Sequence, residues 1–181
     1  MQFGKPLLLL AMALLAASRC ALGQNQPPAS EDFSHLGLDD LLKVKVTTAT
    51  KQAQQLGSIP AAVTVLTREE ILSAGARSVM EALRLVPGVQ VARVDASRYA
   101  ISIRGFNHRY SNKLLVLIDG RSVYVPLFAG VYWEMNDIPL DDLDRIEVVR
   151  GPGGSLWGAN AVNGVINIIT RNAAETHGTA V

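Results

Sequence analysis

Residues 145–170 read RIEVVRGPGGSLWGANAVNGVINIIT, and this stretch predicts two strands joined by a glycine-rich corner. Ile146 and Val148 alternate with Glu147, which predicts a first strand with its carboxylate on the face opposite the apolar side chains. The Gly-Pro-Gly-Gly run that follows must interrupt it, because glycine permits positive φ and proline fixes φ. Residues 164–170 are predicted to form the second strand and are apolar enough to be covered on both faces.

The glycine-rich corner does not carry a phosphate-binding or nucleophile motif. A Walker loop needs a Gly-Lys-Ser/Thr run, and the stretch contains no lysine. Leu156 stands where a dinucleotide fingerprint needs its third glycine, and Trp157 stands where a nucleophile elbow around Ser155 needs its second. We therefore expect these glycines to serve sharp turns and close packing.

Residues 1–23 have the pattern of a secretory signal peptide. Lys5 precedes an apolar run too short to span a bilayer, and residues 21–23 form a small-residue cleavage site. Cleavage would remove Lys5 and Arg19, two of the 17 basic residues and none of the 16 acidic ones, so 15 basic residues would remain against 16 acidic. This balance does not favour a nucleic-acid partner. The polar, proline-bearing residues 24–43 are expected to be a flexible N-terminal segment.

The order of predicted elements is one strand, two helices and then several strands joined by turns. Thr67 and Glu70 form a capping box for a helix over residues 68–73, and a second helix starts at Ser78 and ends before Pro87. Strands are expected over residues 61–66, 89–94, 101–104 and 114–118, with a turn at 119–120. The order predicts an α+β domain, a small mixed β-sheet with two or three short helices.

The sequence nominates no catalytic centre. The three histidines are far apart and have no acid or cysteine at ligand spacing, so we predict neither a metal site nor a cofactor, and no enzyme. Four acids lie near the first strand of the opening stretch, and a solvated face is the expected environment for Asp141, Asp142, Asp144 and Glu147.

Residues 124–136 hold four of the ten aromatic residues of the chain. A segment this aromatic is either packed core or a recognition surface, and residue chemistry alone leaves both interpretations open.

Several short motifs, taken in their order, resemble the plug domain of TonB-dependent outer-membrane receptors. The motifs are IPAAV at 59–63, EAL at 81–83 with VPGV at 86–89, IRGF at 103–106, LVLIDG at 115–120, RIEVVRGP at 145–152, WGANA at 157–161 and GVINIIT at 164–170. The resemblance implies a plug seated inside a β-barrel of about 22 strands in the cell outer membrane. It also implies uptake of a scarce ligand such as a ferric siderophore or cobalamin, driven by TonB and its inner-membrane complex.

The resemblance covers residues 44–171, and residues 172–181 would then begin a barrel that is missing from this chain. A truncated receptor or fragment is the expected explanation. The alternative is a stand-alone periplasmic binding or interaction module that uses the plug fold without a barrel.

The resemblance places a TonB-box candidate near the start of the plug, where it would be extended and bind TonB by strand addition. Its residues are Val46, Thr47, Thr48 and Ala49. Lys43 and Lys45 interrupt the apolar approach that is usual in the family. An ordinary first strand of the domain is the alternative.

Arg104 and Arg150 each end a predicted strand at a glycine. The resemblance implies that these arginines pair with glutamates of the barrel. The alternative is an ion pair inside the plug, with Asp119 or Glu147.

The predicted strands also suggest where a ligand binds. Three turns, at 95–99, 107–112 and 124–136, would alternate between the two ends of the domain, so the first and third would share one end. The resemblance implies that this end faces outward and holds the ligand. The candidates are Arg98, Tyr99, Phe128, Tyr132 and Trp133, a set suited to an anionic or ring-bearing metal chelate. Alternatively, Phe128 and Trp133 fill the seam between plug and barrel.

Overall fold

A computed structural model describes residues 44–174 of the chain. The expected signal peptide at 1–23, the segment at 24–43 and the chain from residue 175 onward lie outside the described residues. No helix within the described part is long and apolar enough to cross a membrane.

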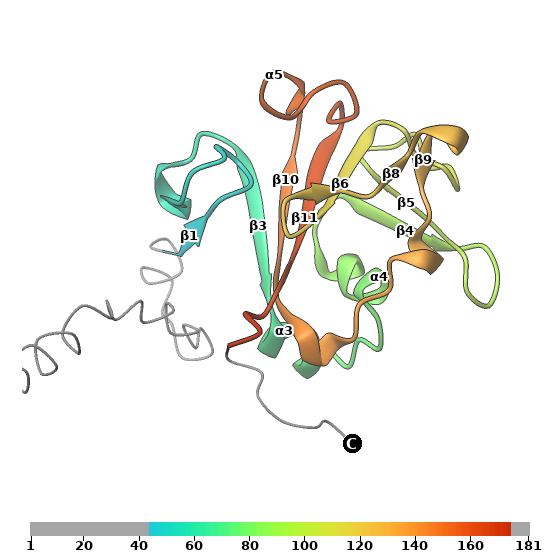
Figure 1. Cartoon of the computed structure of the whole chain (residues 1–181), viewed down its shortest axis with the longest axis horizontal. Helices are drawn as coiled ribbons and strands as arrows, with labels where there is room; N and C mark the ends of the chain where they lie inside the picture. Colours follow the sequence, from blue (N-terminus) through green and yellow to red (C-terminus); the bar gives the residue numbers. More distant parts are fainter. Residues whose placement is uncertain (1–43, 175–181) are drawn as a thin grey trace, which may run out of the picture. The chain divides into compact units, whose positions relative to one another are not determined.

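The opening stretch forms the centre of a five-stranded sheet, as predicted. β10 (Leu143–Arg150) and β11 (Gly164–Thr170) pair antiparallel and are joined through the glycine-rich corner. The strand order is β3-β10-β11-β6-β7, which places these two strands between β3 (Ala62–Thr67) and β6 (Leu114–Ile118) (Figure 1). β11 and β6 run parallel while the other neighbours are antiparallel, so the sheet is mixed.

Both faces of this sheet are covered. Alternate side chains such as Ile146, Val148, Ile166 and Ile168 enter a large apolar core on one face. That core is shared with α3 (Arg68–Ser73), α4 (Val79–Ala82), the 3₁₀ helix η2 (Leu83–Leu85) and the hairpin of β4 (Val89–Arg93) with β5 (Tyr99–Ile103). The intervening side chains form a smaller core on the other face, made of Leu115, Leu117, Val149, Val165 and Ala161.

The helices begin where the sequence predicts. Thr67 Oγ1 accepts a hydrogen bond from the Glu70 backbone N–H at 3.3 Å, and Glu70 Oε2 accepts one from the Thr67 N–H at 2.9 Å, so the capping box is present. Ser78 caps α4 through the N–H of Glu81. Leu85, the last residue of η2, is 43% exposed and does not join the core that Val79, Ala82 and Leu83 enter.

Short elements complete the described fold. They are β1 (Lys45–Val46), β2 (Gln54–Gln55), η1 (Leu56–Ser58), β7 (Arg121–Ser122), β8 (Tyr124–Val125), η3 (Pro126–Phe128), β9 (Gly130–Val131), η4 (Trp133–Met135), η5 (Leu140–Asp142) and α5 (Gly154–Trp157). The α+β prediction, a mixed sheet with two or three short helices, is confirmed.

The turn between β6 and β7 changes the predicted arrangement of the loops. Asp119 and Gly120 both have positive φ, 49° and 77°, as in a two-residue hairpin turn of the mirror-image type. This turn reverses the chain once more before residues 124–136. The segment therefore returns to the end of the domain where residues 104–113 lie, opposite the β4–β5 turn. The predicted shared end is wrong, because the count of turns left out Asp119–Gly120.

Candidate functional site

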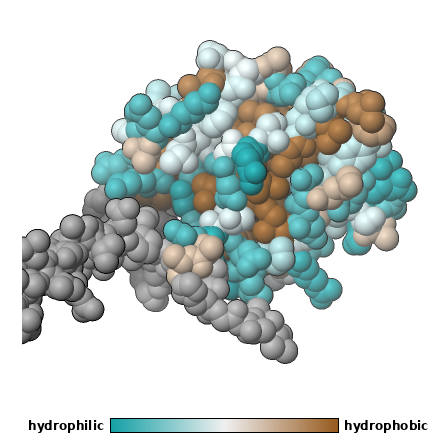
Figure 2. Space-filling view, viewed as in Figure 1, coloured by the Kyte–Doolittle hydropathy of each residue, from teal (hydrophilic) through white to brown (hydrophobic). Residues whose placement is uncertain are grey.

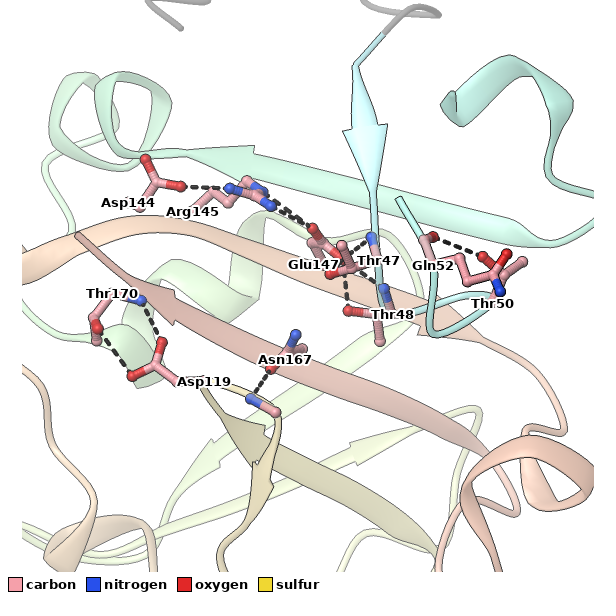
Figure 3. Close-up of polar contacts among 11 residues, drawn as sticks. Thr47, Thr48, Thr50, Gln52, Asp119, Asp144, Arg145, Glu147, Asn167 and Thr170 are labelled. Carbon is pink, nitrogen blue, oxygen red and sulfur yellow. Dashed lines mark hydrogen bonds and ion pairs between the residues drawn. The ribbon is translucent and has the colours of Figure 1, made fainter. Parts of the chain in front are cut away.

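The chain that follows β1 is bound to the middle of the sheet by one carboxylate. Glu147 Oε2 accepts hydrogen bonds from the backbone N–H groups of Thr47 and Thr48, at 3.1 and 2.9 Å. The two threonine hydroxyls also donate to it, at 3.4 and 2.6 Å. Figure 3 shows this arrangement, with Glu147 projecting from β10 toward both threonines. We call Thr47 and Thr48 the threonine pair.

Glu147 is completely buried, which corrects the prediction of a solvated face for this residue. A buried carboxylate is stable only when its charge and lone pairs are satisfied. Arg145 meets this need on the other oxygen, where its guanidinium lies 3.0 Å from Glu147 Oε1. Asp144 holds the same guanidinium from the other side, at 2.5 Å. The carboxylate therefore joins Arg145 on one side to the threonine pair on the other.

Trp157 of α5 holds the same segment from the glycine-rich corner. Its indole Nε1 donates to the backbone carbonyl of Thr48 at 2.7 Å, and the ammonium of Lys51 lies 4.6 Å from its ring centroid. A hollow of about 440 Å³ lies beside this contact, lined by both threonines, Lys51, Trp157, Arg145 and Asn167 among others. The corner thus fixes the position of the N-terminal segment in addition to joining two strands.

The TonB-box candidate is extended only at its start. Lys45 and Val46 pair with β2, whereas residues 47–50 form a turn, so the prediction of an extended conformation is wrong beyond Val46. The threonine pair bends because both N–H groups reach one carboxylate oxygen. Val46 and Thr48 are buried, at 0% and 1% exposure, and Ala49 packs against the smaller core.

Arg104 and Arg150 lie close to each other at one end of the domain. Arg104 Nη1 lies 3.9 Å from the position that a Cβ on Gly151 would occupy, and the Arg104 N–H donates to the Gly88 carbonyl at 3.2 Å. Arg150 donates to the Pro87 carbonyl at 3.1 Å. Within residues 44–174, neither guanidinium makes an ion pair.

In the described part of the chain, neither arginine forms the alternative ion pair with Asp119 or Glu147. Glu147 pairs with Arg145. Asp119 instead accepts hydrogen bonds from the backbone and hydroxyl of Thr170, at 2.8 and 2.9 Å.

An aromatic patch, which we define as Tyr110, Phe128 and Tyr132, gathers where residues 124–136 meet the loop after β5. The Tyr132 ring centroid lies 5.1 Å from those of both Tyr110 and Phe128. Burial, and then the neighbouring Tyr110 hydroxyl, raise the pKa of Tyr132 above its usual value. Gly130 permits this contact, because a Cβ there would lie 2.8 Å from Tyr110.

The surroundings of the aromatic patch are apolar and cationic. Phe106, Leu127 and Met135 are 68%, 81% and 79% exposed. Figure 2 shows hydrophobic side chains gathered at the end of the domain where β8 and β9 lie in Figure 1. Arg109 lies 4.8 Å from the Tyr110 ring and pairs with Glu134, and Lys113 lies 3.7 Å from the Phe106 ring. Such a surface suits a ring-bearing ligand with negative charge.

The structure brings together only two of the five predicted ligand residues, Phe128 and Tyr132. Tyr99 is not in a loop but begins β5 and is 6% exposed, and Trp133 is 2% exposed in the large core. Arg98 lies at the other end of β5, where its guanidinium pairs with Asp95. Hydrogen bonds from the backbones of Ser97 and Arg98, together with this pair, lower the pKa of Asp95.

Sequence reasoning missed three residues of these sites, Tyr110, Glu147 and Trp157. The burial of Glu147 could have been predicted, because its strand pairs with residues 164–170, which the sequence predicts to be covered on both faces. Within the described part of the chain, no group of three His, Cys, Asp or Glu side chains could hold a metal ion.

The chain matches a family of known proteins and is similar in sequence to a transporter and an outer membrane protein of Vibrio. Residues 55–165 match the TonB-dependent Receptor Plug Domain family. The chain is 38% identical over 138 residues to the vitamin B12 transporter BtuB of Vibrio vulnificus, covering 75% of this chain and 22% of that protein. It is 40% identical over 131 residues to an iron-regulated outer membrane virulence protein of Vibrio cholerae, covering 70% and 20%.

A solved structure of an outer membrane receptor also matches the fold of this chain. The pyoverdine outer membrane receptor FpvA of Pseudomonas aeruginosa PAO1, bound to pyoverdine, superposes with a TM-score of 0.59 at 26% identity, covering 71% of this chain and 18% of that one. The chain therefore spans about a fifth of the length of the relatives it matches.

Proposed function

Because this chain belongs to the TonB-dependent receptor plug domain family, a family of receptors and transporters rather than enzymes, we propose that it gates energy-coupled uptake of a scarce ligand across the outer membrane. The family match over residues 55–165 carries this proposal. The plug at 44–171 would sit inside a barrel of about 22 strands that begins at 172–181, after export by the signal peptide at 1–23. A ferric siderophore or cobalamin is the proposed ligand class, supported by the names of the vitamin B12 transporter and the pyoverdine receptor.

TonB is the proposed energising partner, and residues 46–49 are its proposed contact. Strand addition to a short segment near a chain terminus is a common mode of peptide recognition. The segment lies at the start of the described chain, and its turn at 47–50 is held by side-chain contacts rather than by a sheet ladder. Such contacts can be exchanged for a partner strand without unfolding the sheet.

Arg104 and Arg150 are the proposed contacts with barrel glutamates. Both arginines lie against the segments around Gly88 and Gly151, so their positive charges share one end of the domain, which favours carboxylates on the facing wall. The described residues supply no such carboxylate to either arginine.

In a full-length receptor, Arg150→Ala is expected to loosen the seating of the plug. Removing one partner of a buried ion pair costs about 3 kcal/mol, because the facing carboxylate stays buried without compensation. Hydrogen exchange of the plug amides should therefore become faster in the variant, whereas Arg77→Ala, which removes an exposed arginine, should leave it unchanged. Equal exchange in both variants would show that Arg150 does not hold the plug in place.

The aromatic patch, with Arg109 beside it, is the proposed ligand surface. It replaces the five residues nominated from sequence, because Tyr99 and Trp133 are buried and Arg98 lies at the other end of β5. Phe128 is exposed and the rings of Tyr110 and Tyr132 are half-buried, which leaves ring surface for the aromatic or conjugated parts of a chelate, and the cation favours its negative charge.

In a full-length receptor, the double variant Phe128→Ala with Tyr132→Ala is expected to weaken ligand binding about thirtyfold, because two ring contacts of roughly 1 kcal/mol each are lost. The probes are cobalamin, a ferric tris-catecholate and a ferric trihydroxamate, and affinity is measured for those that the unaltered receptor binds. Arg98→Ala, on the opposite loop, serves as the matched control and should bind normally. The reverse order of effects would favour the β4–β5 turn as the ligand surface.

A further inference from the structure

The backbone around the threonine pair has its hydrogen-bonding groups already occupied. The Val44 carbonyl accepts from the Leu56 N–H at 2.8 Å, and β1 is paired with β2. Both threonine N–H groups donate to Glu147, and the Thr48 carbonyl accepts from Trp157. A partner strand that pairs with this segment must displace these contacts.

The geometry of the threonine pair is also incompatible with a strand. In a β-strand, successive N–H groups point to opposite sides, so a partner can bond only alternate residues. Here the N–H groups of two successive residues, Thr47 and Thr48, point at the same oxygen of Glu147. Binding to the carboxylate and pairing with a partner strand therefore exclude each other.

The two side chains that hold the pair come from different parts of the domain. Glu147 lies on the central strand β10 and bonds the N–H groups and hydroxyls, while Trp157 lies on α5 and bonds the carbonyl. Hydrogen bonds to a carboxylate are stronger than hydrogen bonds between neutral groups. Glu147 therefore contributes more than Trp157 to holding the threonine pair in place.

We infer that Glu147 and Trp157 are positioning residues that keep the threonine pair in a non-pairing conformation and so set how tightly a strand-adding partner binds. The inference rests on the proposed TonB contact at residues 46–49. If only a small fraction of molecules has the segment released, the apparent dissociation constant of the partner is raised by that fraction. Weakening either holding contact then tightens partner binding without adding any new contact.

The decisive variant is Trp157→Phe, which removes the indole N–H but keeps a ring beside Lys51. Trp157 is only half-buried, so the variant should fold. The probe is the purified periplasmic domain of TonB, titrated against the full chain. Loss of one net hydrogen bond is expected to tighten binding about fivefold and to speed amide exchange at Thr47 and Thr48.

A second variant, Glu147→Gln, should also tighten TonB binding, and more strongly than Trp157→Phe. The matched control, Thr50→Ala, changes a residue of the same turn whose hydroxyl donates to the Gln52 carbonyl and not to Glu147, and should leave the affinity unchanged.

The outcomes separate the two proposals. A tighter complex for Trp157→Phe supports the inference. If Trp157 served only the stability of the fold, the substitution would lower the affinity for TonB or leave it unchanged. Binding of equal or lower affinity in Trp157→Phe overturns the inference alone, whether or not Glu147→Gln folds. If neither the unaltered chain nor any variant binds TonB, while amide exchange at the pair still rises, the TonB contact itself is wrong and the inference fails with it.

Discussion

Replacing Thr48 with proline is expected to abolish energy-coupled uptake by the full-length receptor while leaving ligand binding unchanged. Proline has no N–H and fixes φ, so it removes a donor that strand addition would need and restricts the preceding Thr47. The same change also deletes the 2.9 Å bond to Glu147 and so releases the segment. Uptake should nevertheless fall, because TonB cannot bind by strand addition to a released segment that is unable to form a strand.

The measurement is accumulation of radiolabelled ligand by cells, compared with binding of the same ligand to isolated outer membranes. Thr48→Ser is the matched control, because it keeps both the N–H and the hydroxyl that reach Glu147. Uptake should be normal in the serine variant and absent in the proline variant. Normal uptake with proline would move the TonB contact to another part of the chain.

This variant and Trp157→Phe form a complementary pair. Both release the threonine pair from the sheet, but only proline damages its ability to form a strand. Opposite effects of the two on TonB affinity would show that pairing and release are separate properties of the same segment.

Local sequence signals predicted most of the sheet. The alternation around Ile146, the apolar run from Gly164 and the Asp-Gly pair identify β10, β11 and the turn after β6 because each signal depends on neighbouring residues alone. The capping box at Thr67 belongs to the same class, since its two hydrogen bonds join residues three apart.

The candidate sites were harder to predict because their contacts are distant in sequence. Glu147 meets the threonine pair across 99 and 100 positions, and Trp157 meets Thr48 across 109. Periodicity places Glu147 opposite Ile146 but does not say what covers that face. The burial of Trp133 and the approach of Tyr110 to Phe128 likewise depend on how loops return to the sheet, and one uncounted turn reversed that prediction.

Gly164→Ala is expected to destabilise the chain by about 3 kcal/mol, the upper part of the range for overpacking a well-filled interior. A Cβ at this position would lie 2.5 Å from the Val149 carbonyl oxygen and 2.7 Å from Ile103 Cδ1. Val149 belongs to β10, which is bonded on both sides, so its backbone cannot move without disturbing the centre of the sheet. Denaturant unfolding of the purified chain measures the effect as a lower midpoint with unchanged slope.

Gly154→Ala tests whether the cost arises from this contact or from any added methyl group in the glycine-rich region. Gly154 is the first residue of α5, and the nearest heavy atom to its Cβ position is the Ala161 carbonyl oxygen at 4.0 Å. Alanine there should leave the midpoint unchanged or raise it slightly, because it restricts the unfolded chain without a clash. If both variants unfold at the same denaturant concentration, the close approach of β5 and β10 to Gly164 does not limit stability. If only Gly164→Ala unfolds early, the start of β11 requires glycine because two strands pack directly against it, and not because the corner needs an unusual backbone conformation there.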